Sequence, residues 1–213
     1  MTRIAVIDYG MGNLRSVAKA LQAVSPEDEI YVSSKSQDVA RADRVVFPGQ
    51  GAMAGCMAGL ENFGLHDTVI AAARNKPFFG VCMGLQMLFE FSEEGGNLPG
   101  LGIFPGRVVR FDVSGATDGM NRPLKIPHMG WNEVNYAQDH PMWRGIPDRS
   151  RFYFVHSYCA QPSNLPDTAA TTDFPEPFTS AIARDNIFAT QFHPEKSAMA
   201  GLTLYRNFIQ WNP

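Results

Sequence analysis

Two periods alternate in the hydrophobic pattern of the first half of the chain. Short apolar runs, typical of buried strands, occupy residues 4–7, 30–32, 44–47 and 77–81. Helical spacing of apolar residues predicts one helix from Leu14 to Leu21, behind Asn13 as a candidate N-cap, and another from Leu65 to Ala73. Short strands that alternate with helices predict a parallel sheet with helices on both faces, whose ligands bind beyond the carboxyl ends of the strands.

The pattern becomes β-rich after about residue 100. Six further strand-like runs, divided by Gly, Pro, Asn and Asp, occupy residues 103–111, 130–135, 151–158, 169–174, 179–184 and 187–192. A last helical pattern extends from Leu202 to Ile209. We therefore expect an α/β fold with a mostly parallel central sheet and a β-rich C-terminal half on the same core. Because no repeat, charge block or low-complexity linker divides the chain, we predict one domain over residues 1–213.

Composition narrows the class of protein. The chain has 213 residues with 45% hydrophobic and 18% charged residues, and its net charge of -3 gives no electrostatic reason to expect nucleic acid or an anionic membrane. No apolar stretch is long enough for a transmembrane helix, and the apolar run after Met1 is too short for a signal peptide. Three cysteines without a C-x-x-C pair favour a reduced cytoplasmic enzyme over a disulfide framework or a zinc site.

One cysteine lies in a setting that suits a nucleophile. The segment Gly80-Val-Cys82-Met-Gly84 lies where a strand-like run gives way to a helical pattern from Leu85 to Phe89. Its G-x-nucleophile-x-G arrangement is that of a nucleophile elbow, in which a sharp turn lifts the side chain out of the sheet. The following helix N-terminus favours a thiolate, and the N–H of Met83 is free to face an oxyanion. The alternative for this motif alone is a small buried cysteine, which is our interpretation of Cys56 and Cys159.

A histidine and a glutamate close the last strand-like run, in the segment Gln191-Phe-His193-Pro-Glu195. Residues two apart in an extended chain point to the same side, so His193 and Glu195 can lie side by side. A carboxylate on one ring nitrogen fixes the tautomer and leaves the other nitrogen to accept a proton. The alternative is a surface histidine beside a glutamate. His128 and His156 also lie near strand ends, but no adjacent carboxylate supports either of them as the base.

A glycine loop allows two interpretations. The segment Gly49-Gln-Gly51-Ala-Met-Ala54 matches the G-x-G-x-x-A pattern of dinucleotide sites. However, Pro48 intrudes before the first glycine, the strand is not the first of the sheet, and no acidic residue ends a strand about twenty positions later. We favour a loop that presents a second backbone N–H to an oxyanion.

No histidines occur at metal-ligand spacing, so we predict neither a metal nor a cofactor.

Together these motifs resemble those of the class I glutamine amidotransferases, and most closely the family of glutaminase subunits of imidazole glycerol phosphate synthases. The resemblance extends along the whole chain, through the segments Asp8-Tyr-Gly-Met-Gly-Asn-Leu14, Pro48-Gly-Gln-Gly51, Gly80-Val-Cys-Met-Gly-Leu-Gln86, Pro127-His-Met-Gly-Trp-Asn132, Phe154-Val-His-Ser-Tyr158 and Gln191-Phe-His-Pro-Glu-Lys-Ser197. The cysteine and His-Pro-Glu motifs are typical of the class, whereas the first, fourth and last segments are typical of this family.

The resemblance implies a glutaminase that hydrolyses glutamine to glutamate and ammonia, with Cys82, His193 and Glu195 as the catalytic triad. The oxyanion would be bound by backbone N–H groups of Met83 and of the loop formed by Gly49, Gln50 and Gly51. The amino-acid end of glutamine would be held by Gln86 and Glu94, together with main chain near Ser157 and Tyr158.

The implied partner is a (β/α)₈-barrel cyclase, which forms a heterodimer with the chain and receives ammonia through an internal channel in histidine biosynthesis. Four residues match positions near that partner: Asn13, Trp131, Asn132 and Lys196. Gln50 departs from the family pattern, because relatives commonly carry valine there, and the resting geometry of its loop stays open. Two other interpretations also stay open: another cysteine hydrolase, such as a peptidase or γ-glutamyl hydrolase, and a binding subunit whose active-site residues are vestigial.

Overall fold

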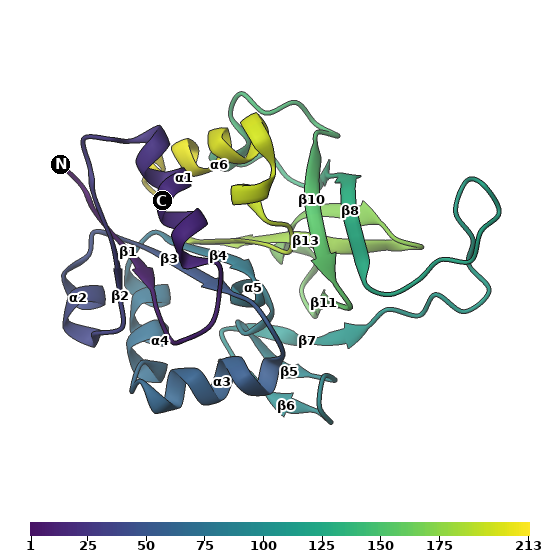
Figure 1. Cartoon of the computed structure of the whole chain (residues 1–213), viewed down its shortest axis with the longest axis horizontal. Coiled ribbons are helices and arrows are strands. Elements are labelled where there is room, and N and C mark those ends of the chain that lie inside the picture. The colour runs from purple at the N-terminus through teal and green to yellow at the C-terminus, as the bar shows by residue number, and fades with distance from the viewer.

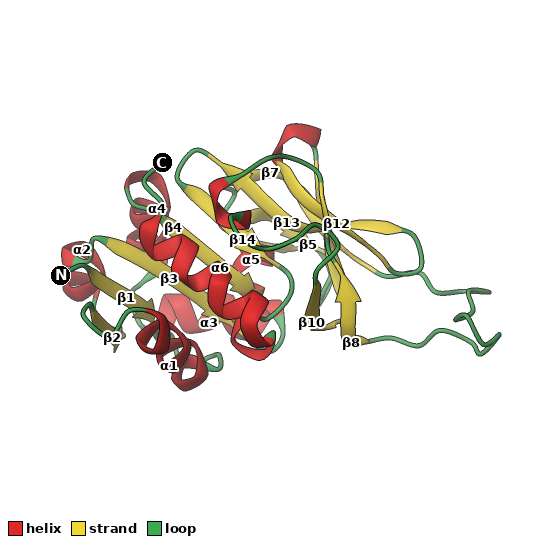
Figure 2. Cartoon of the chain, turned by 90° about the horizontal axis from the view of Figure 1, so that it is seen from above, coloured by secondary structure: helices red, strands yellow, loops and turns green.

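A twisted sheet passes through the molecule and separates two groups of helices (Figures 1 and 2). The computed structural model describes residues 1–213. One half of the sheet has the strand order β2-β1-β3-β4-β14, and all of these neighbours are parallel. Their bounds are β1 Arg3–Ile7, β2 Glu29–Ser33, β3 Arg44–Gly49, β4 Phe78–Cys82 and β14 Ile187–Thr190. The parallel sheet expected for the first half of the chain is therefore confirmed.

The sheet continues beyond β14 in the order β13-β11-β7-β5-β6, with β12 and β9 attached to β13. Most of these neighbours are antiparallel, but β5 and β7 are parallel. The bounds are β5 Phe89–Ser92, β6 Leu98–Pro99, β7 Phe104–Arg110, β9 Asn135–Tyr136, β11 Tyr158–Pro162, β12 Thr168–Asp173 and β13 Pro177–Arg184. A separate antiparallel ribbon pairs β8, His128–Glu133, with β10, Arg151–His156. The β-rich second half of the predicted fold is confirmed.

Helices cover both faces of the parallel half (Figure 1). Helices α1, Leu14–Val24, and α6, Ala198–Gln210, lie together on one face. The other face carries α2 Ser36–Arg41, α3 Met53–Asn62 and α4 His66–Asn75. The remaining helical turns are α5 Met83–Gln86 and the 3₁₀ turns η1 Pro141–Trp143, η2 Leu165–Asp167 and η3 Pro194–Lys196. None of the helices has both the length and the apolar character to cross a bilayer.

The continuous apolar character of the central strands follows from this double covering. In β4, Phe79 and Val81 belong to the hydrophobic cluster that includes α1 and α6, whereas Phe78 belongs to the cluster that includes α3 and α4. Successive side chains of a strand point to opposite faces, so a strand covered on both sides needs apolar residues at every position. The two clusters therefore pack against the same sheet and hold the carboxyl ends of β3 and β4 rigidly.

Three local predictions differ from the structure. The helix predicted from Leu85 to Phe89 ends after four residues at Gln86, because the following carbonyls accept hydrogen bonds from residues 101–104 and Phe89 enters β5. The strand predicted over 151–158 divides at Ser157 into β10 and β11, which belong to different sheets. Asn13 precedes α1, but its side chain makes no capping hydrogen bond.

Candidate active site

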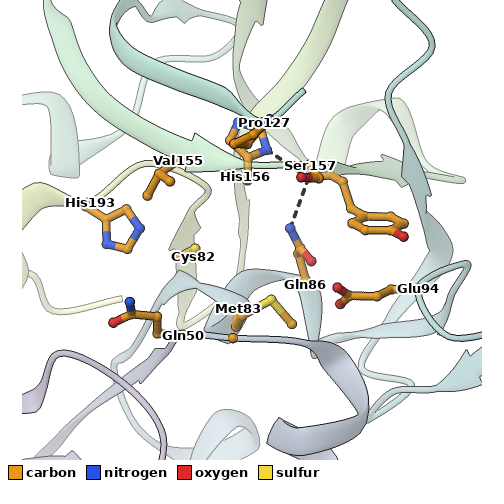
Figure 3. A pocket seen from close by; sticks show the side chains of 12 residues that line it. Gln50, Cys82, Met83, Gln86, Glu94, Pro127, Val155, His156, Ser157 and His193 are labelled. Atoms are coloured by element: carbon orange, nitrogen blue, oxygen red, sulfur yellow. Dashed lines mark hydrogen bonds between the residues drawn. The ribbon is translucent and has the colours of Figure 1, made fainter. Parts of the chain in front are cut away.

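Cys82 ends β4 directly before α5 begins at Met83. Its backbone has φ +56° and ψ -107°, a left-handed conformation that a residue with a side chain seldom adopts. This is the sharp turn of a nucleophile elbow, and it presents the Cys82 sulfur to a pocket at the carboxyl ends of β3 and β4 (Figure 3).

The glycines on either side of Cys82 are needed because backbone segments approach one another closely. A Cβ on Gly84 would overlap the carbonyl oxygen of Phe47 in β3, and a Cβ on Gly80 would lie 2.7 Å from the carbonyl oxygen of Gly84. Contacts this short are forbidden to real side chains. The turn between β4 and α5 can therefore pack against β3 only with glycine at positions 80 and 84.

The imidazole of His193 faces the same pocket as the Cys82 sulfur (Figure 3). Its Nδ1 lies 2.9 Å from Oε1 of Glu195, and the two side chains are only 4% and 1% exposed. Its Nε2 has no hydrogen-bond partner although it is buried. The Ser197 hydroxyl donates to the His193 carbonyl oxygen at 2.6 Å, which holds the chain at η3. The carboxylate thus orients the ring and leaves Nε2 for the chemistry in the pocket.

Opposing influences act on the pKa of His193. Burial lowers the pKa of His193, because it disfavours the charged imidazolium. The negative charge of Cys82, followed by the hydrogen bond and charge of Glu195, outweighs burial and raises the pKa of His193 to about 10. A protonated ring beside the sulfur favours the thiolate, which is the nucleophilic form of cysteine.

The glycine loop forms one side of the pocket. Gln50 and Gly51 line it together with Met83, and Gly51 has φ +107°, which favours glycine. Gly49 lies behind the lining, where a Cβ would be 2.6 Å from the Cβ of Met83 and would overlap the hydroxyl of Tyr9. The loop thus packs against the first residue of α5, so backbone groups from both segments border one space.

The opposite end of the pocket carries polar groups from distant parts of the chain. Gln86 donates from Nε2 to the carbonyl oxygen of Tyr158 at 3.0 Å, and its own Oε1 is buried without a partner. Ser157 and Glu94 line the pocket beside it.

Glu94 also accepts a hydrogen bond from the N–H of Met53 at 2.7 Å. A carboxylate therefore already occupies the N-terminus of α3, where a dinucleotide site would bind the pyrophosphate, and the oxyanion interpretation of the loop is favoured.

Two groups at or behind the pocket lining received no role in the site from the sequence interpretation. Gln191 is fully buried and donates from Nε2 to the Cys82 sulfur at 3.8 Å. His156 lines the pocket and donates from Nδ1 to the Tyr158 carbonyl oxygen at 2.8 Å. Alternation along the last strand places Gln191 on the same side as His193, which is a signal for the first of them. The sequence places His156 only near a strand end, and no local signal indicates its hydrogen bond to the Tyr158 carbonyl oxygen.

Three of the four residues predicted to face a partner lie on or beside the ribbon of β8 and β10: Trp131, Asn132 and Lys196. Trp131 is 43% exposed, its ring contacts Tyr153, and the ammonium of Lys196 lies 5.7 Å from the Tyr153 ring. Asn13 is half-buried at the start of α1, which contacts η3. The side chain of Asn132, in contrast, points inward and donates to the carbonyl oxygen of Asp173 at 2.9 Å.

Known proteins resemble the chain over its full length. The chain is 58% identical over 213 residues to the imidazole glycerol phosphate synthase subunit HisH of Aromatoleum aromaticum and 56% identical over 213 residues to that of Nitrosospira multiformis, with 100% of both chains covered in each case. A crystal structure of a glutamine amidotransferase from Thermotoga maritima matches 93% of this chain and 78% of its own at a TM-score of 0.62 and 17% identity, which shows the fold.

A family model described as glutamine amidotransferase class-I matches residues 5–211. The resemblance of the motifs to this class is therefore confirmed. Because the family model matches nearly its whole length and relatives are more than half identical to it, this chain belongs to the class-I glutamine amidotransferase family.

Proposed function

We propose that this chain is the glutaminase subunit of an imidazole glycerol phosphate synthase, with Cys82, His193 and Glu195 as its catalytic triad. The observation that carries the proposal is the shared pocket, in which a sulfur on a strained strand-to-helix corner faces an imidazole held by a buried carboxylate at 2.9 Å. Full-length identity of more than half to subunits named HisH supports the choice of synthase.

The proposed reaction begins with attack of the Cys82 thiolate on the side-chain amide carbon of glutamine. The carbonyl oxygen becomes an oxyanion, which is stabilised by the N–H of Met83 and by an N–H of the loop from Gly49 to Gly51. The imidazolium of His193 gives its proton to the amide nitrogen, the C–N bond breaks, and ammonia leaves a thioester. Water then attacks the thioester while His193 takes its proton, and glutamate and the thiolate are released.

The polar end of the pocket suits the amino-acid end of glutamine. The unpartnered Oε1 of Gln86 is an acceptor that an α-ammonium group can use, and the Glu94 carboxylate adds negative charge beside it. Backbone N–H and C=O groups near Ser157 and Tyr158 would complete the recognition. We assign substrate binding to these four residues on that basis.

Ammonia would pass to a (β/α)₈-barrel cyclase bound as a heterodimer, which forms imidazole glycerol phosphate and an aminoimidazole ribonucleotide. The exposed Trp131 and the neighbouring Lys196 support a contact surface on the ribbon. Asn13 would lie at the border of this surface, and Asn132 would act through its backbone or its inward hydrogen bonds.

We assign the whole of residues 1–213 to one glutaminase domain, because both hydrophobic clusters pack on one sheet. Three free cysteines fit a reducing cytoplasm.

The test is ammonia release from glutamine, measured with and without a purified cyclase subunit. Cys82→Ala should abolish release, whereas Cys159→Ala, which alters a buried cysteine on β11, should retain it. Turnover of γ-glutamyl peptides in preference to free glutamine would instead indicate a γ-glutamyl hydrolase. A Cys82→Ala protein as active as the parent would end the proposal.

A further inference from the structure

Two series of hydrogen bonds meet at the Tyr158 carbonyl oxygen, one from His156 and one from Gln86, and the second continues through Gln191 to the nucleophile. His156 Nδ1 lies 2.8 Å from the Tyr158 carbonyl oxygen, which can only accept, so Nδ1 carries the proton. Burial lowers the pKa of His156 to about 3, and the ring is therefore neutral with Nε2 as an acceptor. His128 Nδ1 lies 3.0 Å from that Nε2 and must be the donor.

The hydrogen bond between Asn132 and His128 is consistent with His128 donating from Nδ1 to His156. His128 Nε2 is left as an acceptor, and it faces Nδ2 of Asn132 at 3.2 Å. The amide orientation of Asn132 is fixed independently, because its Oδ1 accepts the N–H of Glu133 at 2.8 Å. In each hydrogen bond between Asn132 and the Tyr158 carbonyl oxygen, a donor therefore faces an acceptor.

The inner end fixes the orientation of two glutamine amides. Gln86 presents Nε2 to the Tyr158 carbonyl at 3.0 Å, since that oxygen accepts only, and the same Nε2 lies 2.9 Å from Oε1 of Gln191. Gln191 must therefore turn its own Nε2 toward the Cys82 sulfur, 3.8 Å away. Because Gln191 is fully buried and cannot exchange this contact for water, the donor is directed at the sulfur.

We propose that Gln191 is a positioning residue for the nucleophile: its side-chain amide donates a hydrogen bond to the Cys82 sulfur, and Gln86 and the Tyr158 carbonyl hold that amide in the donating orientation. A donor directed at a thiolate stabilises the charge and restricts the rotation of the side chain. The relevance to turnover rests on the glutaminase function proposed above, whereas the effect on the sulfur itself does not.

Two variants separate this role from simple packing. Gln191→Met fills similar space and removes the donor. Gln191→Glu keeps the shape and the acceptor for Gln86 but places a carboxylate where the donor was. Gln210→Glu, at the exposed end of α6, makes the same chemical change away from the pocket and serves as the matched control.

The measurement is the rate of iodoacetamide alkylation of Cys82 against pH, in the absence of glutamine, followed by peptide mass spectrometry. Burial raises the pKa of Cys56 to about 11 and of Cys159 to about 12, so alkylation near neutral pH reports on Cys82. We expect Gln191→Met to react roughly tenfold more slowly at pH 7, the size expected for one hydrogen bond to a charged group. Gln191→Glu should move the midpoint of the profile further upward, and Gln210→Glu should match the parent.

In glutamine hydrolysis, kcat of both Gln191 variants should fall by more than KM changes. Alkylation profiles of folded variants that coincide with the parent would overturn the proposal, because a packing role predicts no change in Gln191→Met. If Gln191→Met does not fold, as judged by circular dichroism, the near-isosteric Gln191→Glu decides. A parent protein that releases no ammonia even with the cyclase subunit present would refute the glutaminase proposal and leave the alkylation result standing.

Discussion

At the scale of single residues, the site depends on one strained backbone and one buried ion pair. The left-handed φ of +56° at Cys82 is maintained because the surrounding strands and the contact of Gly84 with β3 leave no other path. Glu195 is 1% exposed and its Oε2 is buried without a partner, so its charge acts on His193 with little screening by water. The chemistry at Cys82 is therefore sensitive to that charge.

Glu195→Gln should shift the pH dependence of catalysis. The carboxylate is one of the influences that raise the pKa of His193 to about 10, so its neutralisation lowers that pKa. The alkaline limb of kcat/KM against pH should move to lower pH, and kcat should fall by about 10²-fold, less than for Cys82→Ala. Glu27→Gln, which alters an exposed glutamate, is the control. An alkaline limb that stays in place would show that Glu195 does not act through the His193 charge.

At the scale of elements, the corner is formed by contact between α5 and the end of β3. α5 has only four residues, too few to be stable by itself, so its position depends on packing. The Gly49 position of β3 pairs with Cys82 of β4, which brings the glycine loop beside the nucleophile. The distance between the two segments that we propose to bind the oxyanion is thus set by how closely α5 and β3 approach.

Gly84→Ala should separate the two elements. Its methyl group would overlap the Phe47 carbonyl oxygen, whereas Gly119→Ala, in the loop before β8, would meet no atom within 4 Å. We expect Gly84→Ala to lower the free energy of unfolding by about 1–3 kcal/mol, as for overpacking, and to reduce glutaminase activity. Urea denaturation and ammonia release measure the two effects. Equal stability of both variants would contradict the close contact.

At the scale of the whole molecule, the ribbon of β8 and β10 borders the pocket through Val155 and His156 and lies far from the edge strand β2 (Figure 1). The ribbon exposes Trp131 at 43% and Met129 at 62%. Large exposed apolar side chains near a site are typical of surfaces that bind a partner. The ribbon is therefore the surface on which we propose that the partner subunit binds.

Trp131→Glu should weaken binding of the cyclase subunit. A buried tryptophan at an interface commonly contributes about 2 kcal/mol, so we expect Kd to rise by roughly 30-fold. Val32→Glu places the same charge on β2, where Val32 is 41% exposed at the opposite side of the molecule, and should leave Kd unchanged. Isothermal titration calorimetry measures both. Identical affinity of the Trp131→Glu variant would remove the ribbon from the proposed interface.

The sequence by itself determined the parallel half of the fold and indicated the groups that we propose for catalysis. The central strands are continuous apolar runs, the corner has glycines on both sides of Cys82, and His193 and Glu195 are two residues apart in one segment. Each of these signals is local, because backbone sterics and side-chain periodicity act over a few residues.

Only the tertiary structure decided the rest of the pocket. Gln86 meets the Tyr158 carbonyl across 72 positions of the chain, and Gln191 meets Cys82 across 109. The early end of α5 and the division of the chain at Ser157 likewise follow from hydrogen bonds and pairings between distant segments. Local periodicity carries no information about such contacts, because they form only when packing of the two hydrophobic clusters brings remote segments together and buried polar groups must find partners there.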